Sequence, residues 1–423
     1  MTMESAINPW ASDQSVDIER LHDEFGIERI ETAVDLLPEI PDFMRRGIVF
    51  GHRDYDRIAR AIVNHDPFHV LTGFMPSGHP HLGHLMVMKE VVWHVQQGGR
   101  GYVCIADREA HAVRNLSWDQ CRIYGDEYLA CLYALGFEGE TYQQSSNRVV
   151  QDLAFEASGR VNFSEMSAIY GFTPETDIGH AMSVLTQVAD ILYPQVDDEP
   201  APTIVPVGLD QDPHIRLTRG VAHKLRMFTI EDRDSHISVR SKDAPEEAMK
   251  AVHKAFKGSK KYEGHIDIFG VSHEIVSRTV RAIERTHGGY GFVTPSATFH
   301  RFMPGLTGGK MSSSVPESLI GFCEDDKTVS KKIMGALTGG RMTLQEQKEL
   351  GGEADKCPVY LLNFFHMVTN DAELAEIHRQ CKAGELMCGQ CKKDTAARVL
   401  CFLKEFREKM AVVADKLQCK KSF

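Results

Sequence analysis

The chain has 423 residues, of which 42% are hydrophobic and 25% charged, and this is the balance of a soluble globular protein. Its length predicts two or three domains, and no apolar run approaches the length that a membrane span needs. The net charge of −11 argues against a general nucleic-acid binder, because phosphate contacts need Lys and Arg, although local basic patches are not excluded. The N-terminus lacks the basic and apolar segments of a secretory signal. We therefore expect a cytoplasmic protein with no membrane contact, whose ten cysteines are free thiols or metal ligands.

The pattern of apolar residues changes near residue 68. A short buried strand is expected at 68–72, followed by a loop rich in Gly and Pro, a helix over 82–97 and a second strand at 102–106. This order is a βαβ unit and implies a parallel sheet. A further strand is expected at 203–207. Ligands gather at the carboxyl ends of strands in such sheets, and a polar cluster follows each of these strands.

Three regions follow from these patterns. Residues 1–65 are expected to form a mixed helical N-terminal extension, interrupted by prolines and a glycine. Residues 66–330 are expected to form a Rossmann-like domain with a charged, Lys-rich insertion at about 231–290. Residues 331–423 follow a helical pattern. The expected fold class is therefore α/β, a doubly wound parallel sheet with a helical C-terminal domain.

Two imidazoles are predicted where the first strand of the parallel sheet turns into its helix. His81 and His84 face a helix N-terminus, whose free N–H groups favour an anion. Gly83 removes a side chain, so that a flat base could approach the backbone. A lone H-x-x-H is more often a structural coincidence. Its place at this junction favours a nucleotide site, which the preceding turn would share: Pro76, Ser77 and Gly78.

A second segment, Gly-Gly-Lys-Met-Ser-Ser-Ser, spans residues 308–314. It differs from a Walker-type phosphate loop, because Pro304 stands where that motif needs Gly and Met311 stands where it needs Ser or Thr. We interpret it as a glycine-led loop that carries one Lys and three hydroxyls. A solvated Ser-rich turn is the alternative.

Taken in this order and at this separation, the two segments resemble the HIGH and KMSKS signatures of class I aminoacyl-tRNA synthetases. The second Lys of KMSKS is Ser313 here, so its role is not carried over. The resemblance implies an enzyme that activates an amino acid with ATP and Mg²⁺ and loads it onto tRNA. It also implies that His81 and His84 hold the phosphates and that Lys310 holds the departing pyrophosphate. The neighbouring residues of the loop would complete this part of the site: Met311, Ser312 and Ser314.

Several stretches resemble tryptophan–tRNA ligases of the archaeal and eukaryotic type, namely 205–213, 216–219, 295–298 and the pair Gly351-Gly352. The likeness covers most of the chain except the insertion. It implies that Glu109 binds the ammonium group of tryptophan and that Gln187 and Gln211 line the amino-acid pocket. It also places ATP beside Gly208 and the ATP ribose beside Asp210.

The indole part of the pocket departs from the eukaryotic pattern. A Tyr and a Gln near the indole correspond to Leu71 and Cys104 here. Asp190 lies in a stretch that resembles the bacterial tryptophan enzymes, in which an Asp accepts the indole N–H. Tyrosine enzymes also carry an Asp near this place, so tyrosine–tRNA ligase stays open as an alternative. A solvent-exposed carboxylate on a helix is the other reading of Asp190.

Four cysteines of the C-terminal region have the spacing of metal ligands. The pattern C-x6-C-x2-C is preceded by one more cysteine, and it suits a tetrahedral thiolate site for zinc or an iron–sulfur cluster. Some tryptophan–tRNA ligases carry a four-iron [4Fe-4S] cluster on a nearly identical spacing. Scattered free thiols are the alternative. The four residues are Cys357, Cys381, Cys388 and Cys391.

The expected function is therefore activation of L-tryptophan with ATP and its transfer to tRNA(Trp), by a homodimer whose helical domain reads the anticodon. A non-catalytic tRNA-binding paralogue is one alternative, and the presence of His81, His84 and Lys310 argues against it. A small-molecule nucleotidyltransferase is another. It would explain neither the helical C-terminal region nor the loop around Lys310.

Overall fold

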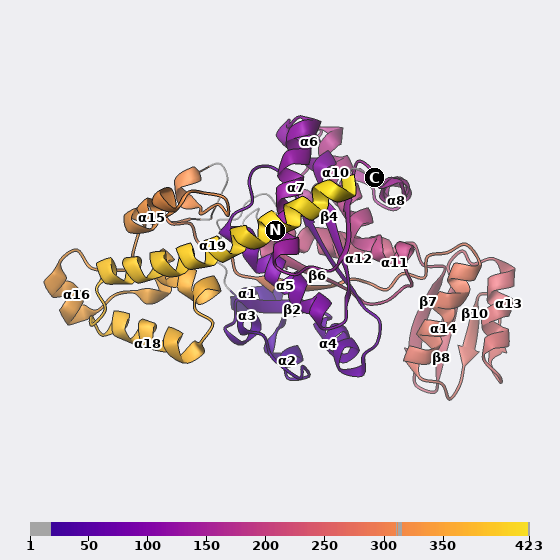
Figure 1. The fold of residues 1–423 in the computed structure, drawn as a ribbon. Helices are drawn as coiled ribbons and strands as arrows, with labels where there is room; N and C mark the ends of the chain where they lie inside the picture. Colours follow the sequence, from indigo (N-terminus) through magenta and orange to yellow (C-terminus); the bar gives the residue numbers. More distant parts are fainter. Residues whose placement is uncertain (1–17, 310, 312–314, 422–423) are drawn as a thin grey trace.

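The structure is a computed structural model, and it describes residues 18–309, 311 and 315–421 (Figure 1). A seven-stranded sheet with the order β1-β2-β11-β6-β3-β4-β5 forms its centre. The strands from β11 to β5 run parallel, whereas β1 and β2 form an antiparallel edge. The expected α/β fold is confirmed. The strands are β1 (Glu28–Arg29), β2 (Val49–Arg53), β3 (His69–Phe74), β4 (Arg100–Ile105), β5 (Gly139–Gln143), β6 (Thr203–Gly208) and β11 (Ser296–His300).

Helices cover both faces of this sheet. Successive residues of a strand point to opposite faces, so Val70 belongs to one hydrophobic core and Leu71 to the other. The first core is completed by α4 (Tyr55–Asn64), α5 (Leu85–Gln96) and α7 (Trp118–Ala134). The second is completed by α8 (Arg148–Ser158), α10 (Ile178–Leu192) and α12 (Asp212–Lys224). Shorter helices connect these elements: α1 (Ile18–Phe25), α2 (Glu31–Val34), α3 (Asp42–Arg45), α6 (Asp107–Arg114), α9 (Phe163–Tyr170) and α11 (Pro194–Asp197).

The N-terminal region contributes a strand to the main sheet, which the prediction of a helical extension missed. β2 pairs with β11, and four of its five residues are buried. Such a short run between loop residues does not show the alternating pattern that identifies a half-buried strand. Gly51 is required here, because a Cβ atom would lie 2.7 Å from the side chain of Ile27.

The insertion folds as a small unit with a core of its own, on one side of the molecule (Figure 1). Its four strands form an antiparallel sheet of order β7-β8-β10-β9, and its two helices pack on one face. The elements are β7 (Phe228–Arg233), β8 (His236–Ser241), α13 (Glu246–Ala255), β9 (Lys260–Lys261), β10 (His265–Ile268) and α14 (His273–Thr286).

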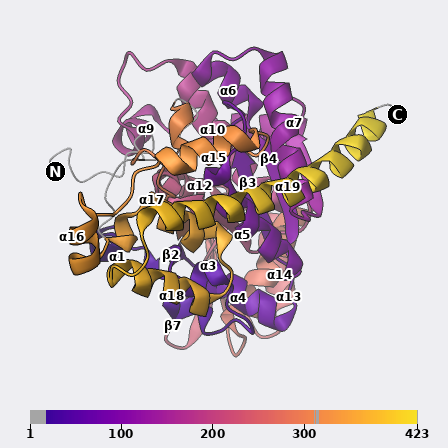
Figure 2. The ribbon, with the colours of Figure 1, turned by 60° about the vertical axis from the view of Figure 1, so that its left-hand side comes forward.

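The C-terminal region is helical, as its pattern predicted, and ends in the long helix α19 (Figure 2). α19 crosses the molecule from the C-terminal helices to α7 of the central domain. Within the described part of the chain, every helix is too short or too polar to cross a membrane. The helices are α15 (Asp326–Gly335), α16 (Leu344–Leu350), α17 (Pro358–Leu362), α18 (Asp371–Lys382) and α19 (Cys388–Lys421).

Candidate active site

A cavity of about 680 Å³ lies at the carboxyl ends of the parallel strands. Each of four strands brings a residue to its wall at or just beyond its last position: Phe74 from β3, Ala106 from β4, Gly208 from β6 and His300 from β11. This is the edge at which ligands bind in open α/β sheets. The cavity is large enough for a nucleotide and a small substrate together.

The two predicted imidazoles lie together at one end of this cavity. His81 and His84 have ring centroids 4.0 Å apart, and both rings line the wall. Nδ1 of His81 accepts the backbone N–H of Gly83 at 3.1 Å, and Nδ1 of His84 accepts the N–H of His81 at 3.2 Å. In a neutral ring these bonds place the proton on Nε2, which becomes a donor. The hydroxyl of Tyr128 on α7 lies 3.2 Å from Nε2 of His84.

Gly83 has a more local role than the one predicted from sequence. A Cβ atom at this position would lie 2.8 Å from the ring of His81 and 3.3 Å from the side chain of Met311. The glycine therefore makes room for the histidine that caps this turn. Met311 also lines the cavity. Three predicted residues of the second segment lie outside the described residues: Lys310, Ser312 and Ser314.

A buried carboxylate lies at the other end of the cavity. Asp190 on α10 is 5% exposed, so the reading of a solvent-exposed helix carboxylate is wrong. Its Oδ2 accepts from Nε2 of Gln144 at 2.7 Å, and its Oδ1 accepts from the hydroxyl of Tyr142 at 3.1 Å. Burial raises the pKa of Asp190 to about 7. Leu71 and Cys104 also line this cavity, and the thiol of Cys104 lies beside Asp190.

Glu109 and two glutamines complete this end. Burial, reinforced by the charge of Asp190, raises the pKa of Glu109 to about 7. Gln187 on α10 donates to the side-chain oxygen of Gln211 at 3.0 Å, and both side chains line the cavity. Titratable groups with raised pKa values that converge in one cavity are typical of a functional site.

Some predicted residues lie beside the cavity. Ser77 and Gly208 line it, but three others are not among its lining residues: Pro76, Gly78 and Asp210. Asp210 lies directly behind Gly208, because a Cβ atom there would be 2.8 Å from Oδ1 of Asp210. We therefore expect Asp210 to act at the rim of the cavity.

Sequence reasoning missed Tyr142 and Gln144, which hold Asp190. Both stand at the carboxyl end of β5, the position that identified the other polar clusters. The strand Gly139–Gln143 is only half-buried and has no apolar run, so it was not recognised as a strand. Tyr128 was missed because it belongs to the interior of a helix.

Residues 63–261 and 272–404 match the family described as tRNA synthetases class I (W and Y). The chain belongs to this family. It is 47% identical over 431 residues to the tryptophan–tRNA ligase of Methanosarcina acetivorans, with 98% of each chain covered. It is 47% identical to that of Archaeoglobus fulgidus, with 96% of this chain and 97% of the relative covered. A solved structure, the tryptophanyl-tRNA synthetase from the hyperthermophilic archaeon Aeropyrum pernix K1, is similar with a TM-score of 0.75 and 33% identity over 96% of both chains. The predicted enzyme class, an aminoacyl-tRNA ligase of class I, is confirmed.

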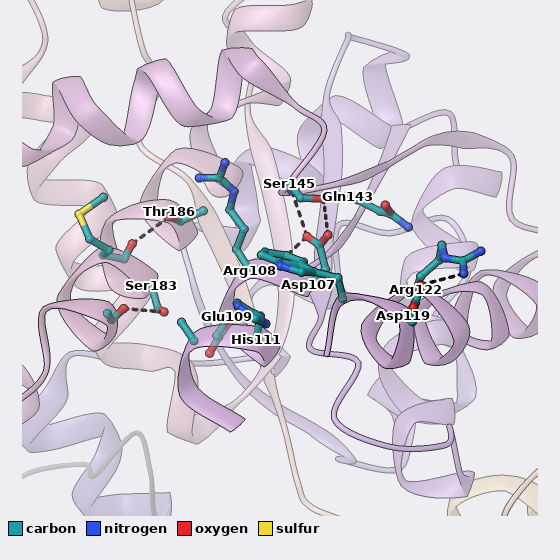
Figure 3. Close-up of a pocket in the computed structure, with 14 residues that line it drawn as sticks. Asp107, Arg108, Glu109, His111, Asp119, Arg122, Gln143, Ser145, Ser183 and Thr186 are labelled. Carbon is teal, nitrogen blue, oxygen red and sulfur yellow. Dashed lines mark hydrogen bonds and ion pairs between the residues drawn. The ribbon is translucent and has the colours of Figure 1, made fainter. Parts of the chain in front are cut away.

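The synthetase has a second cavity, of about 670 Å³, on the other side of Glu109 (Figure 3). Its walls come from α6, α7 and α10. The ring of His111 stacks on Trp118 with centroids 4.1 Å apart, and Arg108 lines the same cavity. Asp107 closes the inner wall through bonds to the backbone N–H and hydroxyl of Ser145.

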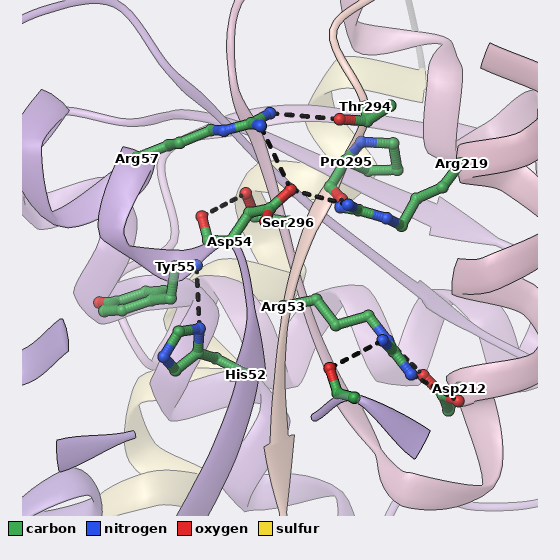
Figure 4. Close-up of polar contacts among 11 residues, drawn as sticks. His52, Arg53, Asp54, Tyr55, Arg57, Asp212, Arg219, Thr294, Pro295 and Ser296 are labelled. Atoms are coloured by element: carbon green, nitrogen blue, oxygen red, sulfur yellow. Dashed lines mark hydrogen bonds and ion pairs between the residues drawn. The ribbon is translucent and has the colours of Figure 1, made fainter. Parts of the chain in front are cut away.

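Two of the stretches that suggested the synthetase family meet behind the site and have a structural role (Figure 4). Arg219 on α12 donates to the carbonyl of Pro295 at 2.7 Å and pairs with Asp54 at 2.8 Å. Asp212, fully buried, pairs with Arg53 at 2.7 Å. These contacts connect β2, α12 and the start of β11, which places α12 and the residues before it at the edge of the cavity.

The four cysteines of the synthetase's C-terminal domain lie around one small cavity of about 20 Å³. Two glycines leave room for their sulfur atoms. A Cβ atom at Gly340 would lie 2.5 Å from Sγ of Cys388, and one at Gly352 would lie 2.9 Å from Sγ of Cys381. Among the described residues, no three His, Cys, Asp or Glu side chains are arranged to hold a single metal ion.

Proposed function

We infer that the protein is a tryptophan–tRNA ligase, which activates L-tryptophan with ATP and transfers the tryptophanyl group to tRNA(Trp). One observation carries this assignment. A single cavity has the paired imidazoles of His81 and His84 at one end and the buried carboxylate of Asp190, beside Gln187 and Gln211, at the other. The first end suits phosphates and the second suits an amino acid whose side chain carries one hydrogen-bond donor. The curated relatives described above carry the same enzyme name.

Activation needs alignment more than acid or base catalysis. The carboxylate of tryptophan is already ionised near neutral pH, and one of its oxygens attacks the α-phosphorus of ATP. A new O–P bond forms, the bond from the α-phosphorus to the bridging oxygen breaks, and pyrophosphate leaves with its electron pair. ATP enters as its magnesium complex, so the magnesium ion is part of the substrate. The protein has to hold the two substrates in line and stabilise the negative charge that moves onto the phosphates.

One end of the cavity binds the phosphates of ATP and the other end binds tryptophan. His81 donates from Nε2 to a phosphate oxygen, because its Nδ1 is occupied by the N–H of Gly83. Asp190 accepts the indole N–H, and its two existing donors hold the carboxylate in place for that bond. Glu109 binds the ammonium group of the substrate, a contact that favours its ionised form. Asp210 acts on the ribose at the rim.

The second step brings the terminal ribose of tRNA to the tryptophanyl adenylate. A ribose hydroxyl attacks the tryptophanyl carbonyl carbon and forms an ester, the bond from that carbon to the phosphate oxygen breaks, and AMP leaves with the electron pair while the hydroxyl proton is released. We propose that the acceptor end approaches through the second cavity beside Glu109, where His111 and Trp118 offer a stacking surface. The C-terminal helical domain reads the anticodon, and we expect the enzyme to work in the cytoplasm.

Amino-acid-dependent exchange of pyrophosphate into ATP tests the assignment. Run across all twenty amino acids, the assay is expected to give the highest kcat/KM with tryptophan. Tyrosine is the informative competitor, because Asp190 would accept a phenol O–H as well as an indole N–H. A preference for tyrosine would overturn the substrate assignment and leave the enzyme class intact. An absence of exchange with every amino acid would favour a non-catalytic tRNA-binding protein.

Lys310 gives a further expected result for the same assay. Replacing Lys310 with alanine should lower the rate of tryptophan activation by on the order of a hundredfold, about 3 kcal/mol, with little change in tryptophan affinity. The reason is that its charge is needed most as pyrophosphate departs. A variant with an unchanged exchange rate and altered binding alone would exclude this role.

We also propose that the four cysteines hold a [4Fe-4S] cluster. Four thiols converge from the residue that precedes α17, from α18 and from α19, and the two adjacent glycines keep the space around the sulfur atoms open. The proposal is supported by the four thiols that line one small cavity and by their spacing in the chain. The cluster would organise the C-terminal domain, because the free energy of its binding adds to that of folding.

Protein purified without oxygen should therefore contain about four iron atoms per chain. Replacing Cys391 with serine should remove the iron and lower the thermal stability of the C-terminal domain. Cys401→Ser is the matched control, because Cys401 lies on the same helix, is exposed, and is not part of the small cavity. Near-stoichiometric zinc in place of iron would show that the four cysteines bind zinc and not an iron–sulfur cluster. The absence of both metals would exclude a metal centre.

We propose that the synthetase is a homodimer that buries an exposed apolar patch on α8, α9 and α10. Phe155 on α8 is 79% exposed, Ile178 on α10 is 80% exposed, and Phe163 on α9 is also exposed. Because α8 and α10 lie side by side, their exposed apolar side chains are typical of an interaction surface. Ile178→Asp should give monomers in light scattering, whereas Ile275→Asp on the insertion, at an exposed isoleucine outside the patch, should not. Monomeric wild-type protein would exclude the proposal.

A further inference from the structure

The helix α19 connects the C-terminal domain with the central domain (Figures 1 and 2). Its first turn carries Cys388 and Cys391, which line the small cavity between the C-terminal helices. Further along, Met410 contacts Cys131 of α7, with the two sulfur atoms 3.9 Å apart. One continuous helix therefore touches both domains.

Arg407 makes the polar contacts of this helix with residues 320–326. Its Nε donates to the carbonyl of Phe322 at 2.8 Å, and Nη2 donates to the carbonyl of Glu324. Its Nη1 donates to Asp326 at 2.7 Å. The ring of Phe322, which is 1% exposed, packs against Phe406 with centroids 4.8 Å apart. The guanidinium thus binds two backbone carbonyls beside a buried aromatic residue.

The same segment supports the first imidazole of the active site. The carbonyl of Ile320 accepts the N–H of Leu82 at 3.0 Å, and Gly321 forms an antiparallel bridge with His81. In the sequence, this segment follows closely on the Lys310 loop. Residues 320–324 are therefore held by Arg407 on one side and hold the turn of His81 on the other.

We propose that Arg407 is a positioning residue for the ATP end of the active site. It acts through residues 320–324 on the turn that carries His81, and it couples the position of α19 to the alignment of ATP. Arg407 itself does not touch the cavity wall. The planar guanidinium of Arg407 donates to two carbonyls and one carboxylate, and the single ammonium group of a lysine cannot donate to all three in the same geometry. The proposal rests on the inferred tryptophan–tRNA ligase activity.

The ion pair with Asp326 should contribute less to holding residues 320–324 than the hydrogen bonds to the two carbonyls. Asp326 is 63% exposed, and exposed ion pairs contribute little. The bonds to the carbonyls of Phe322 and Glu324 are charge-assisted and partly shielded from water, so they should contribute most. Asp326→Asn removes the ion pair and leaves both carbonyl bonds, which makes it the matched control for changes at Arg407.

The test is steady-state pyrophosphate exchange with the full-length enzyme, varying ATP at saturating tryptophan and then the reverse. Arg407→Ala is expected to lower kcat/KM for ATP about tenfold, the lower range for loss of charge-assisted bonds, and to leave the KM for tryptophan within about twofold. Arg407→Lys should retain part of the activity, and Asp326→Asn should equal the wild type. Thermal unfolding of each variant is recorded alongside.

Three outcomes would overturn the proposal. A KM for tryptophan raised in Arg407→Ala by as much as kcat/KM for ATP is lowered would mean that the residue only stabilises the fold, as would a loss that follows the unfolding temperature alone. Equal activities of Arg407→Ala, Asp326→Asn and the wild type would mean that it is an ordinary surface arginine. Exchange by the wild type with tryptophan is measured in the same experiment, so a failure of the inferred activity is seen separately.

Discussion

Replacing Asp190 with alanine is expected to lower kcat/KM for tryptophan by roughly 30- to 150-fold, while the KM for ATP stays nearly constant. This corresponds to about 2–3 kcal/mol, the range for losing a hydrogen bond to a charged group. An indole has a single polar group, its N–H, and a buried site must provide an acceptor for it. Leu71 and Cys104, which line the same cavity, provide no strong acceptor. The measurement is pyrophosphate exchange with tryptophan and tyrosine, wild type and variant side by side.

Asp190→Asn separates the charge of this residue from its volume. The amide oxygen can still accept from Gln144 and the amide N–H can donate to the hydroxyl of Tyr142, so the charge is removed while the cavity keeps its shape. We expect a smaller loss of tryptophan use than with alanine. If the wild type prefers tryptophan and both variants match it, Asp190 does not bind the substrate. If the wild type prefers tyrosine, the carboxylate binds a phenol.

The raised pKa of Asp190 predicts two pH dependences. Since the ionised carboxylate is the better acceptor, kcat/KM for tryptophan should fall as pH drops below about 7, and less so in Asp190→Asn. Glu109 titrates in the same range, so Glu109→Gln is needed to separate the two carboxyls.

The contribution of Asp190 to the stability of the fold changes with pH in the opposite direction. The folded-state pKa lies above the unfolded value of about 4, so the contribution of Asp190 to the free energy of unfolding is lost as pH rises from about 4 through about 7. Asp190→Asn should therefore gain stability relative to the wild type between pH 5 and pH 8.

The placement of His81 and His84 together in the cavity wall was predictable from sequence because these residues are neighbours in the chain. His81, Gly83 and His84 stand in one turn, and the turn follows a buried strand whose pattern is clear. The reason for Gly83 was not predictable, because the ring that fills the space belongs to His81 and its position depends on a backbone hydrogen bond.

The amino-acid end was predictable only in part because its residues come from distant strands and helices. Asp190 was found by resemblance, but its burial depends on Tyr142 and Gln144 from β5, more than forty residues earlier in the chain. β5 is half-buried and lacks an apolar pattern. The strand β2 was missed for a related reason. Its few buried residues can be recognised as a strand only from their pairing with β11, which lies far away in the chain. Long-range pairing of this kind has no local signal.

Replacing His81 with alanine is expected to lower kcat for tryptophan-dependent exchange by on the order of a hundredfold, with the KM for tryptophan unchanged. The ring is held by the N–H of Gly83, so its Nε2 donor is already oriented when ATP binds. Removal of one preoriented donor to a developing charge typically has this effect. The same ring also caps the turn at Leu82–His84, and loss of a cap should lower the free energy of unfolding by about 1 kcal/mol.

His81→Asn distinguishes the donor from the cap. Asparagine is a good capping residue, and its side-chain oxygen can accept the N–H of Gly83 in place of Nδ1. Its short side chain does not extend to the position of Nε2. We therefore expect His81→Asn to restore the stability lost in His81→Ala and to leave kcat about as low. If the asparagine variant recovers both stability and rate, the cap alone is what the enzyme needs from His81, and the phosphates are held by other groups. If it recovers stability alone, the donor at Nε2 is needed for the formation of the adenylate.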